Sequence, residues 1–207
     1  MTEPTIYLVD DDESVRDALS ALLVACGYPN VATFPSAEAL VASLQGPMRG
    51  CVLMDVRMPG MSGLEFVEAY VPRPVDVPVI MLTAHGDVPS AVRAVRAGAR
   101  TMLEKPIESA LLVNEIAQAL AASELTWRLR LEAADLSERL GRLTPREAEV
   151  LDLLFEGRRN KDVAQALDIS ERTVEVHRAR VLEKTGSDSV TDLVRRLLEF
   201  GLHAAAS

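Results

Sequence analysis

The sequence predicts an α/β protein with a five-stranded, doubly wound parallel sheet, followed by a small all-α helix-turn-helix domain. Three observations predict this class. Short apolar runs alternate with helical patterns up to about residue 120, these runs are apolar without interruption, and a second, wholly helical pattern begins near residue 144. A length of 207 residues allows two small domains.

Five short aliphatic runs have the composition of buried strands. Strands that are covered by helices on both faces of a sheet are expected to be apolar throughout. The second run is not followed by a cluster of polar residues like those after the others, so we expect it at the edge of the sheet. The expected strands are Thr5–Val9, Val31–Phe34, Cys51–Met54, Pro78–Leu82 and Thr101–Leu103.

Helical patterns separate these runs. In Glu13–Ala25, for example, Val15, Leu19 and Leu22 recur at the spacing of one helix face. Ser or Asp at the start of a pattern is a typical N-cap, and Gly98 is a typical helix end. The other helices of this part are expected at Ser36–Leu44, Ser62–Ala69, Asp87–Ala97 and from Glu108 onward.

The stretch from Glu108 to Leu140 contains no Gly or Pro, which predicts a long last helix that continues as a linker. A leucine stripe runs along it at helical spacing. The stripe is compatible with packing inside one domain and with pairing to another chain, and both interpretations stay open. Its members are Leu125, Leu129, Leu136, Leu140 and Leu143.

A new unit begins at "LTPREAEVL". Thr144 is a typical N-cap, Pro145 suits the first helical position, and Glu147 completes a capping box. The pattern of short helices that follows is typical of a helix-turn-helix. The expected helices are Pro145–Glu156, Asn160–Leu167, Glu171–Lys184 and Thr191–Gly201. We therefore expect an α/β domain at 1–122, a helical linker at 123–141 and a helix-turn-helix domain at 142–207.

The net charge of -9 argues at first against a nucleic-acid partner. However, the acidic excess is concentrated in the first part of the chain, and residues 158–184 are locally basic. Cys26 and Cys51 both lie among apolar residues and are expected to be buried thiols in a reducing compartment. No signal peptide and no transmembrane run is recognisable, so we expect a cytoplasmic protein without a membrane partner.

Polar residues gather where the first, third, fourth and fifth strands end. Carboxyl ends of parallel strands meet at one edge of a sheet, so these side chains are expected to converge. Crowded carboxylates require a cation, most plausibly Mg²⁺ or Mn²⁺, and a lysine and a threonine could then stabilise a transferring phosphoryl group. For the aspartates after the first strand alone, a solvated turn is the plainer interpretation. The residues are Asp10, Asp11, Asp12, Asp55, Thr83 and Lys105.

Several motifs together resemble those of two-domain response regulators of the FixJ/NarL group. In the first part they are "YLVDDDESVR", "CVLMDVRMPGMSG", "TAHGDVPSAV" and "AGARTMLEKP". In the second they are "LTPREAEVL", "NKDVAQALDISERTVEVHRARV" and "EKTG". The resemblance covers nearly the whole chain except the linker. It implies a flavodoxin-like receiver domain and a LuxR-type helix-turn-helix domain.

The resemblance implies roles for the residues at the sheet edge. Asp55 would be the phosphoacceptor, and Thr83 and Lys105 would bind phosphoryl oxygens. The metal ligands would be Asp11, Asp55 and the backbone carbonyl of Arg57, with Asp10 acting through water.

The same resemblance assigns further positions around that edge. Arg57 and His85 occupy positions that tune the lifetime of the phosphoryl group, and Pro106 would follow a cis peptide bond. Asp12 would be a bystander. Met102 is a departure, because relatives usually carry at this switch position an aromatic side chain that turns inward on phosphorylation.

In the second domain, Glu171–Lys184 would be the recognition helix. Arg and Glu side chains can read base edges, and small apolar side chains can contact a thymine methyl group. The resemblance places Glu175, Val176, Arg178 and Ala179 nearest the bases. The other expected DNA-binding residues, including phosphate anchors, are Arg158, Asn160, Lys161, Thr173, His177, Arg180 and Lys184. For His177, a phosphate contact and a position in a crevice of the fold are equally plausible. Val174, Val181 and Leu182 are expected in the core.

The implied function is a switch and not an enzyme. A histidine kinase would phosphorylate Asp55, the receiver would form a homodimer, and the second domain would bind double-stranded promoter DNA. The helix bearing Val88, Val92 and Val95 is a candidate dimer face, and packing of these valines on the sheet is the plainer interpretation. Two alternatives stay open. One is a constitutive DNA-binding protein with a non-switching receiver. The other is an Mg²⁺-dependent aspartyl phosphatase, which usually has an acid where this chain has Arg57.

Overall fold

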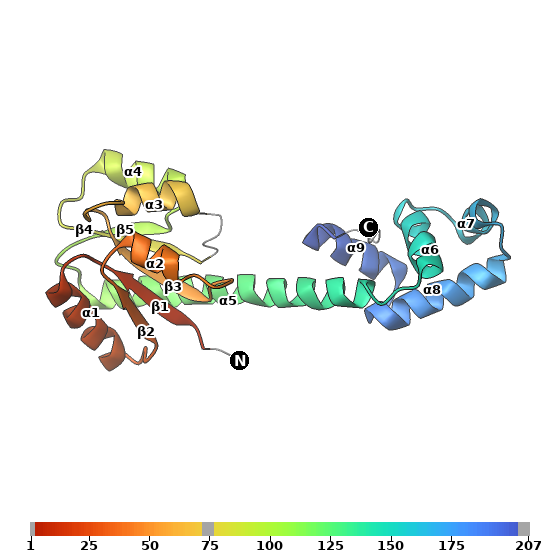
Figure 1. Ribbon diagram of the computed structural model, residues 1–207, viewed down its shortest axis with the longest axis horizontal. Coiled ribbons are helices and arrows are strands. Elements are labelled where there is room, and N and C mark those ends of the chain that lie inside the picture. The colour runs from red at the N-terminus through yellow and green to blue at the C-terminus, as the bar shows by residue number, and fades with distance from the viewer. Residues whose placement is uncertain (1–2, 72–76, 203–207) are drawn as a thin grey trace. The chain divides into compact units, whose positions relative to one another are not determined.

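The computed structural model describes residues 3–71 and 77–202 (Figure 1). The chain forms two compact units, Met1–Trp127 and Arg128–Ser207. Across the described ranges, no helix is both long enough and apolar enough to cross a bilayer.

The first unit contains a five-stranded parallel sheet with the order β2-β1-β3-β4-β5. This confirms the predicted class, and β2 lies at an edge as expected. Each strand begins and ends within one residue of its predicted limits, because aliphatic runs bounded by polar residues define buried strands well. The strands are β1 (Thr5–Val9), β2 (Val31–Phe34), β3 (Gly50–Asp55), β4 (Val79–Thr83) and β5 (Thr101–Glu104).

Helices follow the strands in the predicted alternation. Ser36, Ser62 and Asp87 cap their helices through side-chain oxygens, and Gly98 ends α4 with a φ of 111°. These ends were predictable because caps are local interactions. The helices are α1 (Glu13–Ala25), α2 (Ala37–Ser43), α3 (Gly63–Tyr70), α4 (Val88–Ala97) and α5 (Ser109–Leu140).

The helices cover both faces of the sheet (Figure 1). Helices α2, α3 and α4 pack on one face, against side chains that include Val52 and Met54 of β3. Helices α1 and α5 pack on the other, against side chains that include Cys51 and Leu53 of the same strand. Successive side chains of a strand point to opposite faces, so β3 is buried along its whole length.

The prediction of two buried cysteines is right for Cys51 and wrong for Cys26. Cys51 is fully buried in the middle of the sheet, and burial raises the pKa of its thiol to about 12. Cys26 is exposed, because it follows the last turn of α1 at a position that does not face the sheet. Both thiols are free.

The second unit is all-α. Its helices after α5 are α6 (Pro145–Phe155), α7 (Asn160–Leu167), α8 (Glu171–Thr185) and α9 (Val190–Phe200). The Thr144–Glu147 capping box is present as predicted, with Pro145 at the first helical position. Val174 and Val181 of α8 are buried, and Leu182 packs against the cluster that contains Val181, as expected for core residues.

Burial differs between the two halves of the leucine stripe of α5. Leu136 and Leu140 are buried against Leu151 and other core residues of the second unit. Leu125 is 61% exposed and Leu129 is 38% exposed. Packing within a domain therefore accounts for the second half of the stripe only.

Candidate functional site

The carboxyl edge of the sheet brings four of the predicted side chains to one region. β1 and β3 are neighbours, and Asp10 follows β1 where Asp55 ends β3. β4 pairs with both β3 and β5, which places Thr83 and the chain leading to Lys105 along the same edge. This arrangement follows from parallel topology, in which all strands end on one side.

Asp10, Lys105 and Asp55 form a hydrogen-bonded cluster, which we call the acidic cluster. The Lys105 Nζ donates to Asp10 Oδ2 at 2.6 Å and to Asp55 Oδ1 at 2.5 Å. Asp10 is 2% exposed and Asp55 is 7% exposed. Burial alone would lower the pKa of Lys105, but its bonds to the two carboxylates outweigh this effect and raise the pKa. The lysine is therefore a fixed positive charge between two buried acids.

Backbone groups orient the two buried carboxylates. Asp10 Oδ1 accepts the backbone N–H of Asp12 at 3.0 Å, and the carbonyl of Asp10 accepts a bond from Arg16 Nη1 at 2.7 Å. Asp55 Oδ2 accepts the backbone N–H of Arg57 at 2.7 Å. Each carboxylate is thus held by two donors, so its direction is set by the fold.

Asp12 has a role that the resemblance does not assign to it. Its side chain caps α1 by accepting the backbone N–H groups of Ser14 and Val15. The Ser14 hydroxyl also donates to this carboxylate, and its bond, followed by the backbone bonds, lowers the pKa of Asp12. The signal was present in the sequence, since Asp is a common N-cap and Asp12 immediately precedes the predicted helix.

The oxygens at this edge suit a hard divalent cation. Two buried carboxylates face one ammonium, which leaves negative charge in excess, and Mg²⁺ prefers carboxylate and carbonyl oxygens. Asp11, however, is exposed, and across the described residues no three His, Cys, Asp or Glu side chains form a ready-made metal cluster. Lys105 therefore joins two of the three expected carboxylates, Asp10 and Asp55, and the exposed Asp11 follows Asp10 in the same loop.

Thr83 is buried but directs its hydroxyl to its own loop. The hydroxyl donates to the carbonyl of His85 at 3.0 Å and accepts the backbone N–H of the same residue at 3.2 Å. The side chains of His85 and Arg57 are both exposed. Met102 is partly buried against the core beneath α2, α3 and α4. The Lys105–Pro106 bond is cis, as predicted.

One face of α4 exposes apolar side chains. Val88 is 76% exposed, Val92 is 43% exposed and Val95 is 52% exposed, while Ala94 is fully buried. The three valines therefore do not pack on the sheet. Arg93, on the same helix, forms a two-bond ion pair with Glu68 of α3.

Helix α8, the predicted recognition helix, exposes three of the four side chains that are expected nearest the bases. Glu175, Val176, Ala179 and Arg180 are exposed, and Val176 is 45% exposed despite being apolar. Such a row of polar and apolar side chains on one helix can contact base edges and thymine methyl groups. Arg172 extends the same exposed row toward the start of the helix.

Other predicted DNA-binding residues differ in their surroundings. Lys161 is exposed near the start of α7, and Arg158 forms a surface ion pair with Glu156. Thr173 takes part in the cap of α8, where its hydroxyl lies 2.8 Å from that of Ser170. Asn160 and Arg178 are half-buried.

His177 is half-buried, and the structure shows the surroundings of one of its ring nitrogens. Its Nδ1 is buried and has no hydrogen-bond partner. That nitrogen therefore lies in the crevice of the fold and does not face a phosphate.

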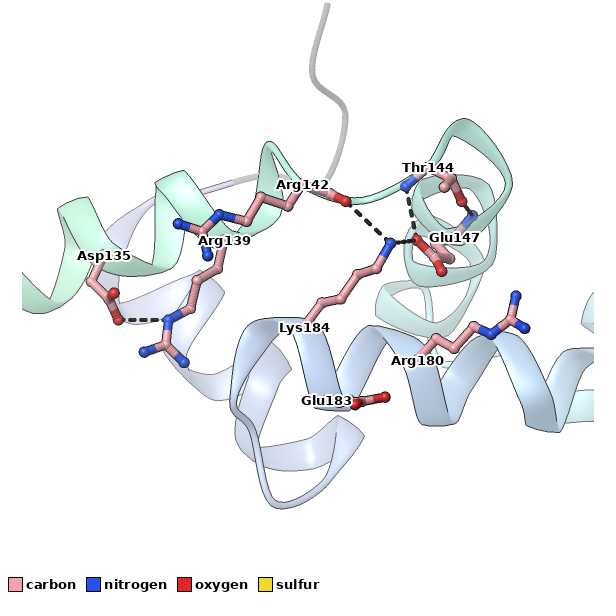
Figure 2. A pocket seen from close by; sticks show the side chains of 8 residues that line it. All are labelled: Asp135, Arg139, Arg142, Thr144, Glu147, Arg180, Glu183 and Lys184. Atoms are coloured by element: carbon pink, nitrogen blue, oxygen red, sulfur yellow. Dashed lines mark hydrogen bonds and ion pairs between the residues drawn. The ribbon is translucent and has the colours of Figure 1, made fainter.

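Lys184, a predicted DNA-binding residue, forms bonds within the second unit (Figure 2). Its Nζ donates to Glu147 Oε2 at 2.6 Å and to the carbonyl of Arg142 at 3.2 Å. The Glu147 side chain is only 3% exposed. Burial alone would raise the pKa of Glu147, but Lys184 and the Thr144 cap outweigh it and lower the pKa to about 2.

Comparison with known proteins assigns both units. Residues 6–117 match the response regulator receiver domain, and residues 141–197 match the bacterial regulatory proteins of the luxR family. The chain belongs to the response regulators. Its relatives include the transcriptional regulatory protein FixJ of Bradyrhizobium diazoefficiens, 39% identical over 97% of this regulator and 98% of the relative. FixJ of Rhizobium meliloti is 41% identical over 97% and 98% of the two chains.

Solved structures agree with this assignment. The response regulator StyR is 38% identical, with a TM-score of 0.80 over 96% of this regulator and 100% of the StyR chain. Full-length FixJ from B. japonicum is 39% identical, with a TM-score of 0.57 over 97% and 98% of the two chains. This response regulator therefore acts in two-component signalling and regulates transcription, as its receiver and LuxR-type domains require. Its family is one of transcriptional regulators, which argues against the phosphatase alternative.

Proposed function

We propose that Asp55 accepts a phosphoryl group from a histidine kinase and that this modification switches dimerisation and DNA binding. The position of Asp55 carries the proposal. Its carboxylate ends β3 at the carboxyl edge of the sheet, with Lys105 on one oxygen and the Arg57 amide on the other. A carboxylate beside a fixed cation is suited to attack phosphorus and to have the new charge neutralised.

The transfer follows from these contacts. A carboxylate oxygen of Asp55 bonds to phosphorus while the P–N bond of the donor phosphohistidine breaks, and its electron pair returns to the imidazole. Lys105, already 2.5 Å from Asp55, would bind a phosphoryl oxygen. Asp11, Asp55 and the carbonyl of Arg57 would hold Mg²⁺, with Asp10 acting through water, and the ion would neutralise phosphoryl charge.

The switch begins at Thr83. Phosphorylation adds a charge of about -1.5 to -2, which attracts hydroxyl donors. To bind the phosphoryl group, the Thr83 hydroxyl must leave the carbonyl of His85, and the loop before α4 then loses that bond. Because α4 exposes Val88, Val92 and Val95, a change in its position would alter an apolar surface suited to a second receiver.

Dimerisation would strengthen DNA binding without any new DNA contact. One helix-turn-helix unit makes few phosphate contacts and is expected to bind weakly and with strong salt dependence. Two linked units on neighbouring half-sites bind more tightly through effective concentration. The exposed face of α8, with Glu175, Val176 and Ala179, would read the bases.

Light scattering with a phosphoryl mimic tests the proposal. With Mg²⁺ and beryllofluoride, the mass of the wild type should double from 22.5 kDa, and it should revert when Mg²⁺ is chelated. Asp55→Asn should stay monomeric, and it should incorporate no phosphoryl group from acetyl phosphate by intact-protein mass spectrometry. Labelling of Asp55→Asn to the wild-type extent would refute the assignment of Asp55. Equal operator binding by wild type and Asp55→Ala, with and without phosphodonor, would favour a constitutive DNA-binding protein.

A further inference from the structure

The loop between β3 and α3 carries Arg57, whose carbonyl the proposed function assigns to Mg²⁺. It spans residues 56–62 and contains Met58, Gly60 and Met61. Met58 is 8% exposed and anchors the start of the loop in the core. The far part of the loop, at Gly60 and Met61, lies closer to the surface and needs another attachment if the whole loop is to be fixed.

That attachment comes from Glu38 of α2. Glu38 Oε1 accepts the backbone N–H of Met61 at 2.7 Å, across 23 positions of sequence. A bond from an amide to a charged carboxylate is stronger than one between neutral groups. The bonds that this carboxylate accepts, first from its own backbone amide and then from that of Met61, also lower the pKa of Glu38.

A second feature shows how closely the loop backbone approaches this carboxylate. Gly60 has a φ of 76°, and a Cβ at this position would lie 2.6 Å from Glu38 Oε1. The positive φ favours glycine here, and a Cβ would displace the Glu38 carboxylate from its present place. The loop therefore lies directly against the Glu38 carboxylate.

Glu38 is itself attached to a rigid element. It lies in the first turn of α2, between Ala37 and Leu40, which are both fully buried in the core that includes β1 and β3. The backbone at Glu38 is therefore fixed relative to the strands that bear Asp10 and Asp55, and its exposed carboxylate reaches the loop through the bond to Met61. A loop that is hydrogen-bonded to α2 keeps its position relative to those strands.

We propose that Glu38 is a positioning residue for phosphoryl transfer, which fixes the loop of residues 56–62 and so the Arg57 carbonyl that binds Mg²⁺. This inference rests on the proposed function of the acidic cluster. Residues that orient metal ligands without touching the metal commonly change metal affinity by about 10-fold to 100-fold when they are replaced. Glu38 has the place and the contacts for such a role.

The test compares three variants of the full chain. Glu38→Ala removes the acceptor for the Met61 amide, whereas Glu38→Gln keeps an acceptor oxygen in the same place. Ala42→Gly is the matched control, because it weakens α2 through helix propensity at an exposed position and leaves the loop contact intact. Each is titrated with Mg²⁺ by calorimetry, and its phosphorylation by acetyl phosphate is followed at low and at saturating Mg²⁺.

We expect Glu38→Ala to bind Mg²⁺ about tenfold more weakly, to be phosphorylated slowly at low Mg²⁺, and to recover when Mg²⁺ is saturating. In the Mg²⁺-free protein, its Met61 amide should lose hydrogen-exchange protection. Glu38→Gln should restore most of the affinity, and Ala42→Gly should resemble the wild type.

The alternatives are distinct. Unchanged Mg²⁺ affinity in Glu38→Ala would overturn the inference while leaving the proposed function intact. An equal loss of affinity in Ala42→Gly would also overturn it, since α2 stability would then explain the effect. A wild type that neither binds Mg²⁺ nor accepts phosphoryl would defeat the proposed function, and this inference with it.

Discussion

Each unit of this response regulator has a lysine that is hydrogen-bonded to a buried carboxylate. The two units differ in the number of carboxylates that face the lysine. In the receiver, Lys105 faces both Asp10 and Asp55. In the DNA-binding unit, Lys184 faces Glu147 alone, and Thr144 donates its backbone N–H to the same carboxylate oxygen. The receiver cluster retains negative charge that a cation can match, whereas the Glu147–Lys184 pair is neutral and complete. The unmatched charge of the receiver cluster therefore suits a bound cation, whereas removal of Lys184 would leave Glu147 as an unpaired buried charge.

The largest expected effect is a loss of unfolding free energy of the DNA-binding unit at acid pH. The pKa of Glu147 is about 2 in the folded chain and 4.5 ordinarily, so its stabilisation is fully present above pH 4.5 and is lost as the pH falls toward 2. The loss should reach about 3 kcal/mol for the DNA-binding unit. Urea unfolding of wild type and Glu147→Gln, followed by circular dichroism at several pH values, measures this. The stability of Glu147→Gln should vary less with pH.

Lys105 predicts an additional loss of receiver stability at alkaline pH. Its pKa is raised in the folded state, so its stabilisation is present below the ordinary pKa of 10.5 and is lost as the pH rises through the raised value. Unfolding of the receiver can be followed separately through Trp127, the single tryptophan of the chain. A receiver whose stability did not fall as the pH rises through the raised pKa of Lys105 would contradict this prediction.

Replacing Lys184 should have the next largest effect. Lys184→Met leaves Glu147 buried without its cation, and because Lys184 is about one-third exposed we expect a loss of about 2 kcal/mol in unfolding free energy. Lys161→Met is the matched control. This exposed lysine should contribute little to stability, yet its loss should weaken DNA binding and reduce the salt dependence. Equal stabilities of the two variants by urea unfolding would show that the Glu147–Lys184 pair is not structural.

Asp12 should give the smallest effect and should separate capping from metal binding. Asp12→Ala removes the cap of α1 and should lower the unfolding free energy of the receiver by about 1 kcal/mol. Its Mg²⁺ affinity should change much less than that of Asp11→Ala, which removes an expected ligand. Calorimetric titration of both variants checks this, and a similar loss of affinity in the two would give Asp12 a part in the metal site.

Much of the receiver could be predicted because its signals are local. The strand limits and the caps at Ser36, Ser62 and Asp87 all depend on residues a few positions apart, as does the capping box at Thr144 in the DNA-binding unit. The arrangement at the carboxyl edge followed from parallel topology, which needs no knowledge of side-chain contacts.

Other features depend on partners far apart in the sequence. The sequence places Lys184 on the predicted recognition helix, but it does not show that its Nζ bonds to Glu147, which lies 37 positions earlier in the chain. Cys26 and Cys51 each have apolar neighbours in the sequence, but only Cys51 is buried. Helical spacing placed Leu125 and Leu136 on one stripe, but it could not show which of them meets a core.

The sequence by itself determined the parallel sheet, the helix-turn-helix and the set of residues at the strand ends, because periodicity, caps and strand order are encoded over short distances. Only the tertiary structure decided how charges are paired. It gave Lys105 two carboxylates and Lys184 one, and it fastened the loop at Met61 to Glu38. The physical reason is that the energy of a buried charge depends on the groups that folding brings within hydrogen-bonding distance, and adjacency in the chain does not specify them.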